Sequence, residues 1–281
     1  MNRNYIKKMI RQALDEDFGM LGDITTDSVF SKSDDIVSSA EIIVKSSGVI
    51  AGTDVAMFVF KEIDSNIEIL KLYNDGDLVK SGKVIMKLKG KVSSLLKGER
   101  LALNFLQRMS GIATKVNKIV KIIESYGVKV VDTRKTTPNF RVFEKLAVKA
   151  GGGFNHRSGL YDMVMIKDNH IKAAGSLKEA VKRVREKIGH SVKIEIEVQN
   201  MAQLKEAVDS KADVIMLDNF TAADVKNLIK LIPEHIITEC SGNITEKNII
   251  EYAKSGPDII SMGSLTHSYS SLDISMEIIS E

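Results

Sequence analysis

The segment Lys193-Ile194-Glu195-Ile196-Glu197-Val198 alternates strictly between charged and apolar side chains, a pattern that predicts a β-strand. Its Ile and Val residues share one face of the strand, and Glu195 and Glu197 share the other. An edge strand with one face in water would show this pattern. A strand of a parallel barrel would show it too, with an inward carboxylate near the top of the barrel that needs a cation as its partner.

Short apolar runs of the same kind recur on both sides of this segment, and helical patterns lie between most of them. The runs are Lys129–Val131, Met163–Ile166, Val214–Leu217, Ile236–Thr238 and Asp258–Met262, and the helical patterns include Ser176 to Ile188, Met201 to Val208 and Thr245 to Lys254. This alternation predicts parallel strands joined by crossover helices. A (β/α) barrel is favoured over a doubly wound open sheet, because nearly every run ends in polar residues and a barrel carries its functional groups at those strand ends.

Residues 1 to about 103 follow a different pattern, which opens with a helix and continues through β-rich segments. These segments are Val37 to Val44, Gly48 to Ile50, Ile67 to Leu72 and Lys83 to Leu88. They lack long crossovers, so we expect an antiparallel sheet with one or two helices against it. The turn sequence Asn74-Asp75-Gly76-Asp77 predicts a hairpin, since Gly and Asn tolerate positive φ.

A helical repeat follows from Glu99 to Glu124, with apolar residues every three or four positions. Ser110-Gly111 predicts a break between two helices within it.

Composition limits the kind of protein that the chain can be. At 281 residues with 43% hydrophobic and 27% charged residues, it resembles a globular protein of one or two domains. A net charge of +3, without a run of basic residues, argues against nucleic acid as a partner. The one cysteine, Cys240, excludes an internal disulfide and fits a reducing compartment. With no long apolar run and no signal peptide pattern, we expect a cytoplasmic protein that does not span a membrane.

Five basic side chains gather on the predicted loops of the second half. Arg134 and Lys135 follow a strand closely and stand beside Thr133, whereas His156 and Arg157 follow a triple glycine and Lys167 ends the apolar run Met163–Ile166. The Arg-Lys pair could be a solvated loop pair, and His156 could be a structural histidine. A basic cluster on loops, however, is typical of a pocket for a compact, multiply negative small molecule.

Acidic and glycine-containing strand ends complete the predicted site. Glu197 and Asp218 are carboxylates at neighbouring strand ends, and Mg²⁺ is commonly held by one or two carboxylates with substrate phosphates and water. The loops Ser241-Gly242-Asn243 and Gly263-Ser264 follow the last two runs, where barrels often bind phosphate. No Gly-x-Ser-x-Gly elbow, Walker-type loop or close-spaced His/Cys set is present, so a serine hydrolase or metal hydrolase has little support.

Several motifs of the chain occur together in one known family. They are Asp132-Thr133-Arg134-Lys135-Thr136-Thr137-Pro138, Gly151-Gly152-Gly153-x-x-His156-Arg157, Ile166-Lys167-Asp168-Asn169-His170, Glu195-x-Glu197-Val198, Met216-Leu217-Asp218-Asn219, Ser241-Gly242-Asn243, Gly263-Ser264-Leu265-Thr266-His267-Ser268 and, in the first half, Gly22-Asp23-Ile24-Thr25-Thr26, Glu99-Arg100-x-x-Leu103-Asn104 and Ser110-Gly111-Ile112-Ala113-Thr114. This set closely resembles quinolinate phosphoribosyltransferase, also called nicotinate-nucleotide pyrophosphorylase (carboxylating). One departure is Asn139, which stands where many members have glycine. Because Asn tolerates unusual backbone angles, we expect a local change of the loop rather than lost activity.

The resemblance implies the α/β fold class, with an N-terminal α/β sandwich over residues 1–103 and an incomplete, seven-stranded parallel α/β barrel over residues 104–269. The C-terminal tail, residues 270–281, would return to the first domain. It also implies a homodimer, or a hexamer made of three dimers, in which Arg100 reaches the neighbouring subunit's site.

The implied activity is that of a pentosyltransferase of NAD biosynthesis, with quinolinate and 5-phosphoribosyl 1-diphosphate as substrates and Mg²⁺ as cofactor. The resemblance implies that Arg134, Lys135, His156, Arg157 and Lys167, with the neighbour's Arg100, hold the carboxylates. Glu197 and Asp218 would anchor Mg²⁺ and the ribose hydroxyls, while Ser241, Gly242, Asn243, Gly263 and Ser264 would bind the 5-phosphate. Lys135, Glu197 and Asp218 would be the catalytic residues, and Thr133 would bind substrate.

Two other readings share the fold. A paralogue found in molybdenum transport operons has the Asp-Thr-Arg-Lys and Gly-Gly-Gly loops but lacks the Ile-Lys-Asp-Asn-His segment, which is present here around Lys167. A non-catalytic ligand-binding relative would have no need of the Mg²⁺ carboxylates Glu197 and Asp218.

Overall fold

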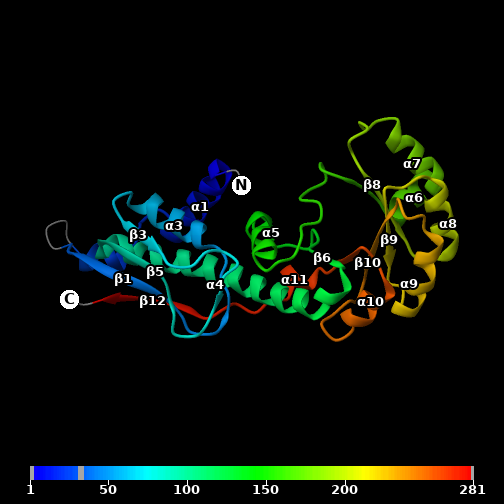
Figure 1. Cartoon of the computed structure of the whole chain (residues 1–281). Coiled ribbons are helices and arrows are strands. Elements are labelled where there is room, and N and C mark those ends of the chain that lie inside the picture. The colour runs from blue at the N-terminus through cyan, green and yellow to red at the C-terminus, as the bar shows by residue number, and fades with distance from the viewer. Residues whose placement is uncertain (1–2, 31–34, 280–281) are drawn as a thin grey trace. The chain divides into compact units, whose positions relative to one another are not determined.

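A computed structural model describes residues 3–30 and 35–279 of the chain, and it divides into two compact units. The first unit comprises Met1–Lys115, Lys149–Gly151 and Tyr269–Glu281, and the second comprises Val116–Val148 and Gly152–Ser268. Figure 1 shows the elements of each unit in chain order. The boundary at residue 103 stays a prediction.

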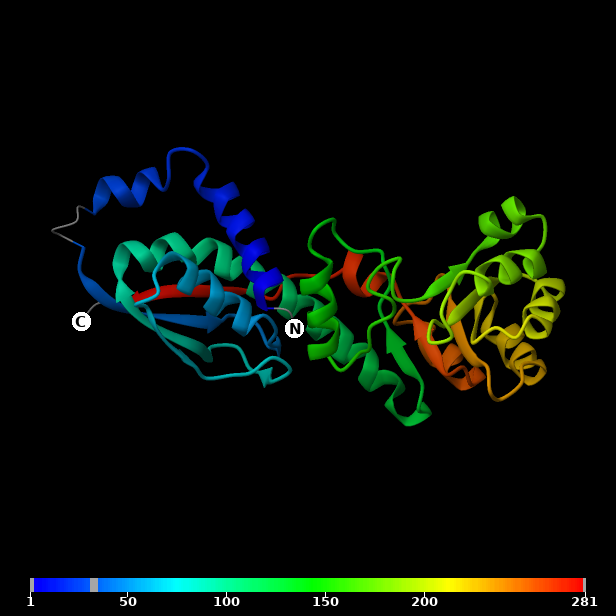
Figure 2. The same ribbon diagram turned by 90° about the horizontal axis from the view of Figure 1, so that it is seen from above.

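The first unit is an antiparallel sheet with helices, as expected. Its sheet has the strand order β12-β1-β5-β3. The elements are α1 (Arg3–Phe18), α2 (Ile24–Val29), β1 (Val37–Val44), β2 (Gly48–Val49), α3 (Thr53–Ile63), β3 (Glu68–Lys71), β4 (Leu78–Val79), β5 (Val84–Lys91), α4 (Val92–Ile123) and β12 (Ile274–Ile279). Figure 2 shows the red C-terminal strand β12 beside the blue strand β1, and the two pair antiparallel from Ser39↔Ile279 to Val44↔Ile274.

The turn at residues 74–77 forms, but the hairpin predicted from it does not. Strand β3 pairs with β5, and the strand that follows the turn, β4, pairs with β2 instead. The side chain of Asp75 explains the difference, because it accepts hydrogen bonds from the backbone N–H groups of Gly52 (3.0 Å) and Thr53 (2.9 Å). The turn is therefore tied to the start of α3, and its backbone also bonds to Ile50 directly after β2.

The predicted break at Ser110-Gly111 is wrong, since α4 is one continuous helix. Ser110 is fully buried, and its hydroxyl accepts a hydrogen bond from the backbone N–H of Ala51 at 3.0 Å. A Cβ on Gly111 would lie 2.1 Å from the carbonyl oxygen of Ser270. Both small residues thus allow other segments of the unit to approach the helix closely, and neither ends it.

The second unit consists of parallel strands with helices between them. Its elements are β6 (Lys129–Val131), α5 (Arg141–Ala150), β7 (Val164–Ile166), α6 (Asp168–Ala174), α7 (Leu177–Arg185), β8 (Ile194–Val198), α8 (Met201–Asp209), β9 (Val214–Asp218), α9 (Ala222–Leu228), β10 (Ile237–Ser241), α10 (Ile249–Ser255), β11 (Ile259–Ser261) and α11 (Ser264–His267), with short 3₁₀ turns at Glu124–Tyr126 and Ile229–Leu231. Figure 1 shows α7, α8 and α9 on the outer side of β8 and β9.

The strand order β6-β11-β10-β9-β8-β7 identifies the sheet as a barrel with one open seam. Consecutive strands from β7 to β11 are neighbours, and the first strand, β6, pairs with the last, β11. A doubly wound sheet would instead reverse its order at an internal point. The α/β fold class is therefore confirmed.

The barrel has six strands among the described residues, not the seven that we expected. At the seam, Phe154 forms only an isolated bridge to Val131. The glycines at 151–153 precede this bridge, and His156 begins the next loop, so no strand develops there.

Strand β8 is a central strand, which rules out the edge-strand reading of the alternating segment. All five of its residues, Ile194–Val198, are buried. Glu195 and Glu197 therefore face the barrel interior.

No helix of the described chain combines the length and apolar character that a membrane span requires.

Candidate active site

A cavity of about 690 Å³ opens at the C-terminal ends of the barrel strands. Its lining includes every site residue that the sequence analysis named except Arg100. These residues are Thr133, Arg134, Lys135, His156, Arg157, Lys167, Glu197, Asp218, Ser241, Gly242, Asn243, Gly263 and Ser264. Arg100 is an exposed residue of α4 in the first unit.

The two arginines of the cavity have few partners within the protein. The buried Nε of Arg134 has no hydrogen-bond partner among the described residues. Arg157 makes long contacts of 3.4 Å to the Met163 carbonyl and to the sulfur of Met165. Burial lowers the pKa of Arg157, and the nearby charge of Arg134 lowers it further. Two guanidinium groups that repel each other in a cavity favour the binding of an anion between them.

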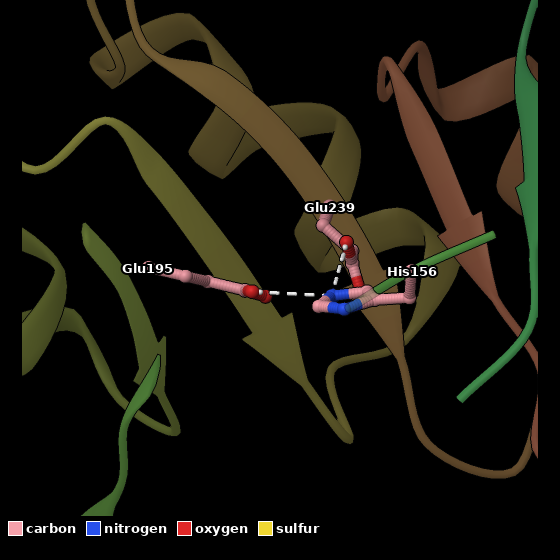
Figure 3. Close-up of side chains that lie close together, drawn as sticks. All are labelled: His156, Glu195 and Glu239. Atoms are coloured by element: carbon pink, nitrogen blue, oxygen red, sulfur yellow. Dashed lines mark ion pairs between the residues drawn. The ribbon is translucent and has the colours of Figure 1, made fainter. Parts of the chain in front are cut away.

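His156 is held in the protein by both of its ring nitrogens, as Figure 3 shows for one of them. Its Nε2 lies 3.1 Å from Glu195 Oε2 and 3.4 Å from Glu239 Oε2, and its Nδ1 accepts the backbone N–H of Arg157 at 2.7 Å. Both glutamates are essentially inaccessible to solvent, with side-chain exposures of 0% and 1%. The alternative that His156 is a structural histidine thus has direct support, although the residue also lines the cavity.

The His156, Glu195 and Glu239 side chains bring three possible metal-ligand atoms within 4.8 Å of one another. Burial by itself lowers the pKa of His156, yet hydrogen bonds and charges from Glu195 and Glu239 outweigh it and raise the pKa to about 10. A proton on Nε2 satisfies the contacts of this nitrogen with the two carboxylates, while Nδ1 accepts the N–H of Arg157.

The carboxylates Glu197 and Asp218 stand at the ends of the adjacent strands β8 and β9. Glu197 accepts a hydrogen bond from Lys167 Nζ, so two residues that we assigned to different ligands pair with each other. The two described hydrogen bonds of Asp218 both reach Oδ2, from Asn219 at 2.7 Å and Gln199 at 3.4 Å. No described side chain donates a hydrogen bond to Oδ1 of Asp218, so this oxygen is available to a ligand. Carboxylate oxygens of this kind suit Mg²⁺.

The loop Ser241–Asn243 depends on backbone conformations with positive φ. Gly242 has φ 93°, and a Cβ there would lie 2.2 Å from the side-chain oxygen of Asn219. The helix expected to begin near Thr245 begins only at Ile249, because Thr245 and Asn248 first form a turn in which the Thr245 N–H donates to Asn248 Oδ1 at 2.7 Å. The loop itself, rather than the end of a long helix, faces the cavity.

Several residues that line the cavity were not named as site residues in the sequence analysis. They are Met165, Met216, Asn219, Glu239, Ile244, Thr245, Ser261, Met262 and His267. Glu239 was missed because the apolar run was ended at Thr238, whereas β10 continues to Ser241. An extension of that strand by the same alternation would have placed Glu239 inside the barrel.

An open parallel barrel with cations and carboxylates at its strand ends defines an α/β-barrel protein that holds small anionic ligands. Comparison with known proteins then identifies the family. The sequence model "Quinolinate phosphoribosyl transferase, N-terminal domain" matches residues 23–110, and the one for the C-terminal domain matches residues 112–277. The chain belongs to the quinolinate phosphoribosyltransferase family.

Curated relatives and solved structures agree with this membership. The chain is 45% identical over 278 residues to the probable nicotinate-nucleotide pyrophosphorylase [carboxylating] of Bacillus subtilis, with 99% of this chain and 95% of the relative covered. It is 41% identical to the protein of the same name from Methanocaldococcus jannaschii, with 99% of each covered. The structure of the nicotinate-nucleotide pyrophosphorylase from Francisella tularensis matches with a TM-score of 0.93 at 39% identity, covering 99% of this chain and 98% of that one.

Proposed function

We propose that the protein transfers the phosphoribosyl group of 5-phosphoribosyl 1-diphosphate to quinolinate with decarboxylation. The products are nicotinate mononucleotide, diphosphate and CO₂, and the reaction belongs to NAD biosynthesis. The observation that carries the proposal is that the pair Arg134 and Arg157 lines one cavity together with the carboxylates Glu197 and Asp218. This combination suits a dianionic ring bound by the arginines and a metal-bound diphosphate ester bound at the carboxylates.

The cations of the cavity bind and orient quinolinate. Arg134 and Arg157 offer planar guanidinium groups that suit carboxylates, and Lys167 adds a point charge. His156 also lines the cavity, and both of its ring nitrogens have protein partners. Arg100 of the neighbouring subunit completes the set in a homodimer or a trimer of dimers.

The residues at and after the ends of strands β8 to β11 bind the phosphoribosyl group. The N–H groups and side chains of Ser241–Asn243 and of Gly263–Ser264 hold the 5-phosphate, and Glu197 and Asp218 hold the ribose hydroxyls. Mg²⁺, when bound by Glu197 and Asp218 together with substrate oxygens and water, would neutralise charge on the diphosphate. Thr133 and Lys135 also line the cavity, and Lys135 stabilises the departing negative charge.

The reaction needs positioning more than a protein nucleophile. The pyridine nitrogen attacks C1 of the ribose as the bond from C1 to the diphosphate oxygen breaks. The ring nitrogen is then positive, so the bond to the adjacent carboxylate can break, leaving its electron pair on the ring carbon, which takes up a proton. Alignment of the two reactants alone can lower the free-energy barrier of such a reaction by about 7–11 kcal/mol.

Incubation of the purified protein with quinolinate, 5-phosphoribosyl 1-diphosphate and Mg²⁺ tests the proposal. We expect equal molar amounts of CO₂ and diphosphate. Replacement of quinolinate by nicotinate is the control, because it lacks the carboxylate that leaves. Diphosphate release without CO₂, or no release at all, would contradict the proposed function.

A further inference from the structure

A buried ion pair joins the two basic loops of the cavity and has no part in the chemistry proposed above. Asp132 directly precedes Thr133–Lys135, and its side chain is fully buried. Its partner is Lys145 of α5, whose Nζ lies 2.5 Å from Asp132 Oδ1 and whose side chain is only 6% exposed. The pair therefore connects the end of β6 to the helix behind the second basic loop.

The pair holds the backbone of His156 from both sides. Asp132 Oδ1 accepts the N–H of His156 at 2.8 Å, and Lys145 Nζ donates to the carbonyl oxygen of His156 at 3.1 Å. In the amide orientation that satisfies its hydrogen bonds, Asn155 donates to Asp132 Oδ2 at 2.8 Å. Backbone N–H, backbone carbonyl and both ring nitrogens of His156 thus all have protein partners.

Arg157 is the next residue, and its own backbone N–H is one of those partners. Its position therefore follows from the position of His156. Among the described residues, its guanidinium is otherwise held by two contacts of 3.4 Å, to the Met163 carbonyl and the sulfur of Met165. We infer that Asp132 and Lys145 are positioning residues, which fix the loop of Arg157 relative to the loop of Arg134 so that both cations meet one dicarboxylate ligand. This inference rests on the proposed function for the identity of that ligand, quinolinate.

Physical reasons favour positioning over stability as the role of the pair. A buried ion pair is weak evidence of stabilisation, because desolvation of both charges can exceed their attraction. Burial indeed raises the pKa of Asp132, although Lys145 opposes the shift. By contrast, a displacement of about 1 Å in a binding group can reduce activity about 100-fold. A pair that sets the distance between two cations has its main effect there.

The test separates stability from ligand binding with three variants of the full-length protein. Lys145→Met leaves Asp132 buried without its cation, so we expect a lower melting temperature and weaker quinolinate binding. Asp132→Asn combined with Lys145→Met removes both charges, so the melting temperature should return toward that of the wild type. In the double variant, however, the His156 carbonyl still lacks its donor. We therefore expect the dissociation constant for quinolinate to stay raised about 10- to 100-fold.

The control is Asp213→Asn. Asp213 also accepts a backbone N–H, that of Ile194 at 2.7 Å, and pairs with Arg185 at 3.0 Å, but it lies at the opposite end of the strands. Its removal should leave quinolinate binding unchanged. Calorimetry with quinolinate and, separately, with 5-phosphoribosyl 1-diphosphate and Mg²⁺ measures both affinities, and only the first should change in the double variant.

If the double variant recovers both its quinolinate affinity and its melting temperature, the ion pair is merely structural and the inference is overturned. Equal losses for both substrates, or unchanged quinolinate affinity in Lys145→Met, would overturn it as well. The turnover of the wild-type protein tests the proposed function separately. A wild type that binds quinolinate and shows the expected variant pattern without releasing CO₂ would refute the function and keep the inference, whereas no binding to the wild type would refute both.

Discussion

At the scale of single residues, the cavity is notable for arginines that the protein itself leaves without strong partners. Arg134 Nε is buried and lacks a partner among the described residues, where the Arg157 guanidinium contacts the Met163 carbonyl and the Met165 sulfur at 3.4 Å each. Unmet hydrogen-bonding capacity of this kind costs free energy in the unliganded protein and is recovered when a carboxylate binds. We therefore expect a bound carboxylate ligand, rather than a group of the protein, to accept the hydrogen bonds of both guanidinium groups.

Arg134→Ala should consequently affect quinolinate use and not stability. A hydrogen bond to a charged group contributes about 1.5–3 kcal/mol, which corresponds to a loss of about 10- to 150-fold in kcat/KM for quinolinate. Steady-state kinetics with each substrate varied in turn measures this loss, and thermal unfolding serves as the control. Wild-type kinetics in this variant would remove Arg134 from the site.

The reactivity of the Cys240 thiol tests how closely the barrel is packed around this residue. It is fully buried, and burial, with a smaller contribution from the charge of Glu239, raises the pKa of its thiol to about 12. Because the thiolate is the reactive form, we expect almost no reaction with an aromatic disulfide reagent at pH 8 in the native protein. The same reagent should react fully in guanidinium chloride. Since the chain has one cysteine, rapid native labelling would place Cys240 outside the core.

At the scale of elements, Asn139 shows how a loop tolerates the departure from glycine. Asn139 has φ 60°, in the left-handed region that Gly and Asn adopt more easily than other residues. The turn around it is closed by a hydrogen bond from the Phe140 N–H to the Thr137 carbonyl at 3.0 Å. Glycine and asparagine are thus interchangeable here for a conformational reason.

Two substitutions at this position should separate backbone strain from function. Asn139→Gly should keep turnover within about twofold, because glycine adopts the same backbone angles without strain. Asn139→Val should lower the free energy of unfolding by about 1–2 kcal/mol, since a β-branched residue is strained at positive φ. Steady-state kinetics measures the turnover of each variant, and urea denaturation measures its free energy of unfolding. Equal stability of the two variants would mean that the loop relaxes to another conformation.

The elements also show what a single sequence can predict and where it fails. Strands β1, β6 and β8 lie where the apolar patterns placed them, because alternation and apolar runs report burial directly. The hairpin at residues 74–77 and the break at Ser110-Gly111 failed for a common reason. In both places a residue type that often turns the chain serves a tertiary contact instead, through Asp75 at α3 and Gly111 against Ser270. Such contacts are invisible to local patterns.

The candidate site was predicted more completely than the fold around it. Loops that follow parallel strands converge at one end of a barrel, so strand ends alone brought Arg134, Lys167 and Asp218 into one cavity. What the sequence could not predict is the pairing inside that cavity. Lys167 contacts Glu197, and His156 faces two buried glutamates, because pairings between strands depend on register rather than on spacing along the chain.

At the scale of the whole molecule, the proposed assembly predicts that each site needs two chains. Arg134 lines the cavity of its own chain, whereas Arg100 is an exposed residue of the first unit. Assayed at subsaturating quinolinate, Arg100→Ala and Arg134→Ala should each retain about a tenth or less of wild-type turnover as pure proteins. When the two variants are mixed, unfolded and refolded together, half of the dimers are hybrids, and each hybrid has one site with both arginines intact. We therefore expect recovery of about a quarter of wild-type turnover.

The size of that recovery separates a shared site from other effects. If Arg100 acted within its own chain, every site of a hybrid would lack one arginine, and the mixture would be as inactive as its components. Arg100→Ala mixed with itself is the control for refolding, and gel filtration confirms that dimers or larger assemblies re-form. A mixture that stays inactive, with assemblies of normal size, would show that no arginine crosses between subunits. The cations of one chain would then have to hold both carboxylates of quinolinate by themselves.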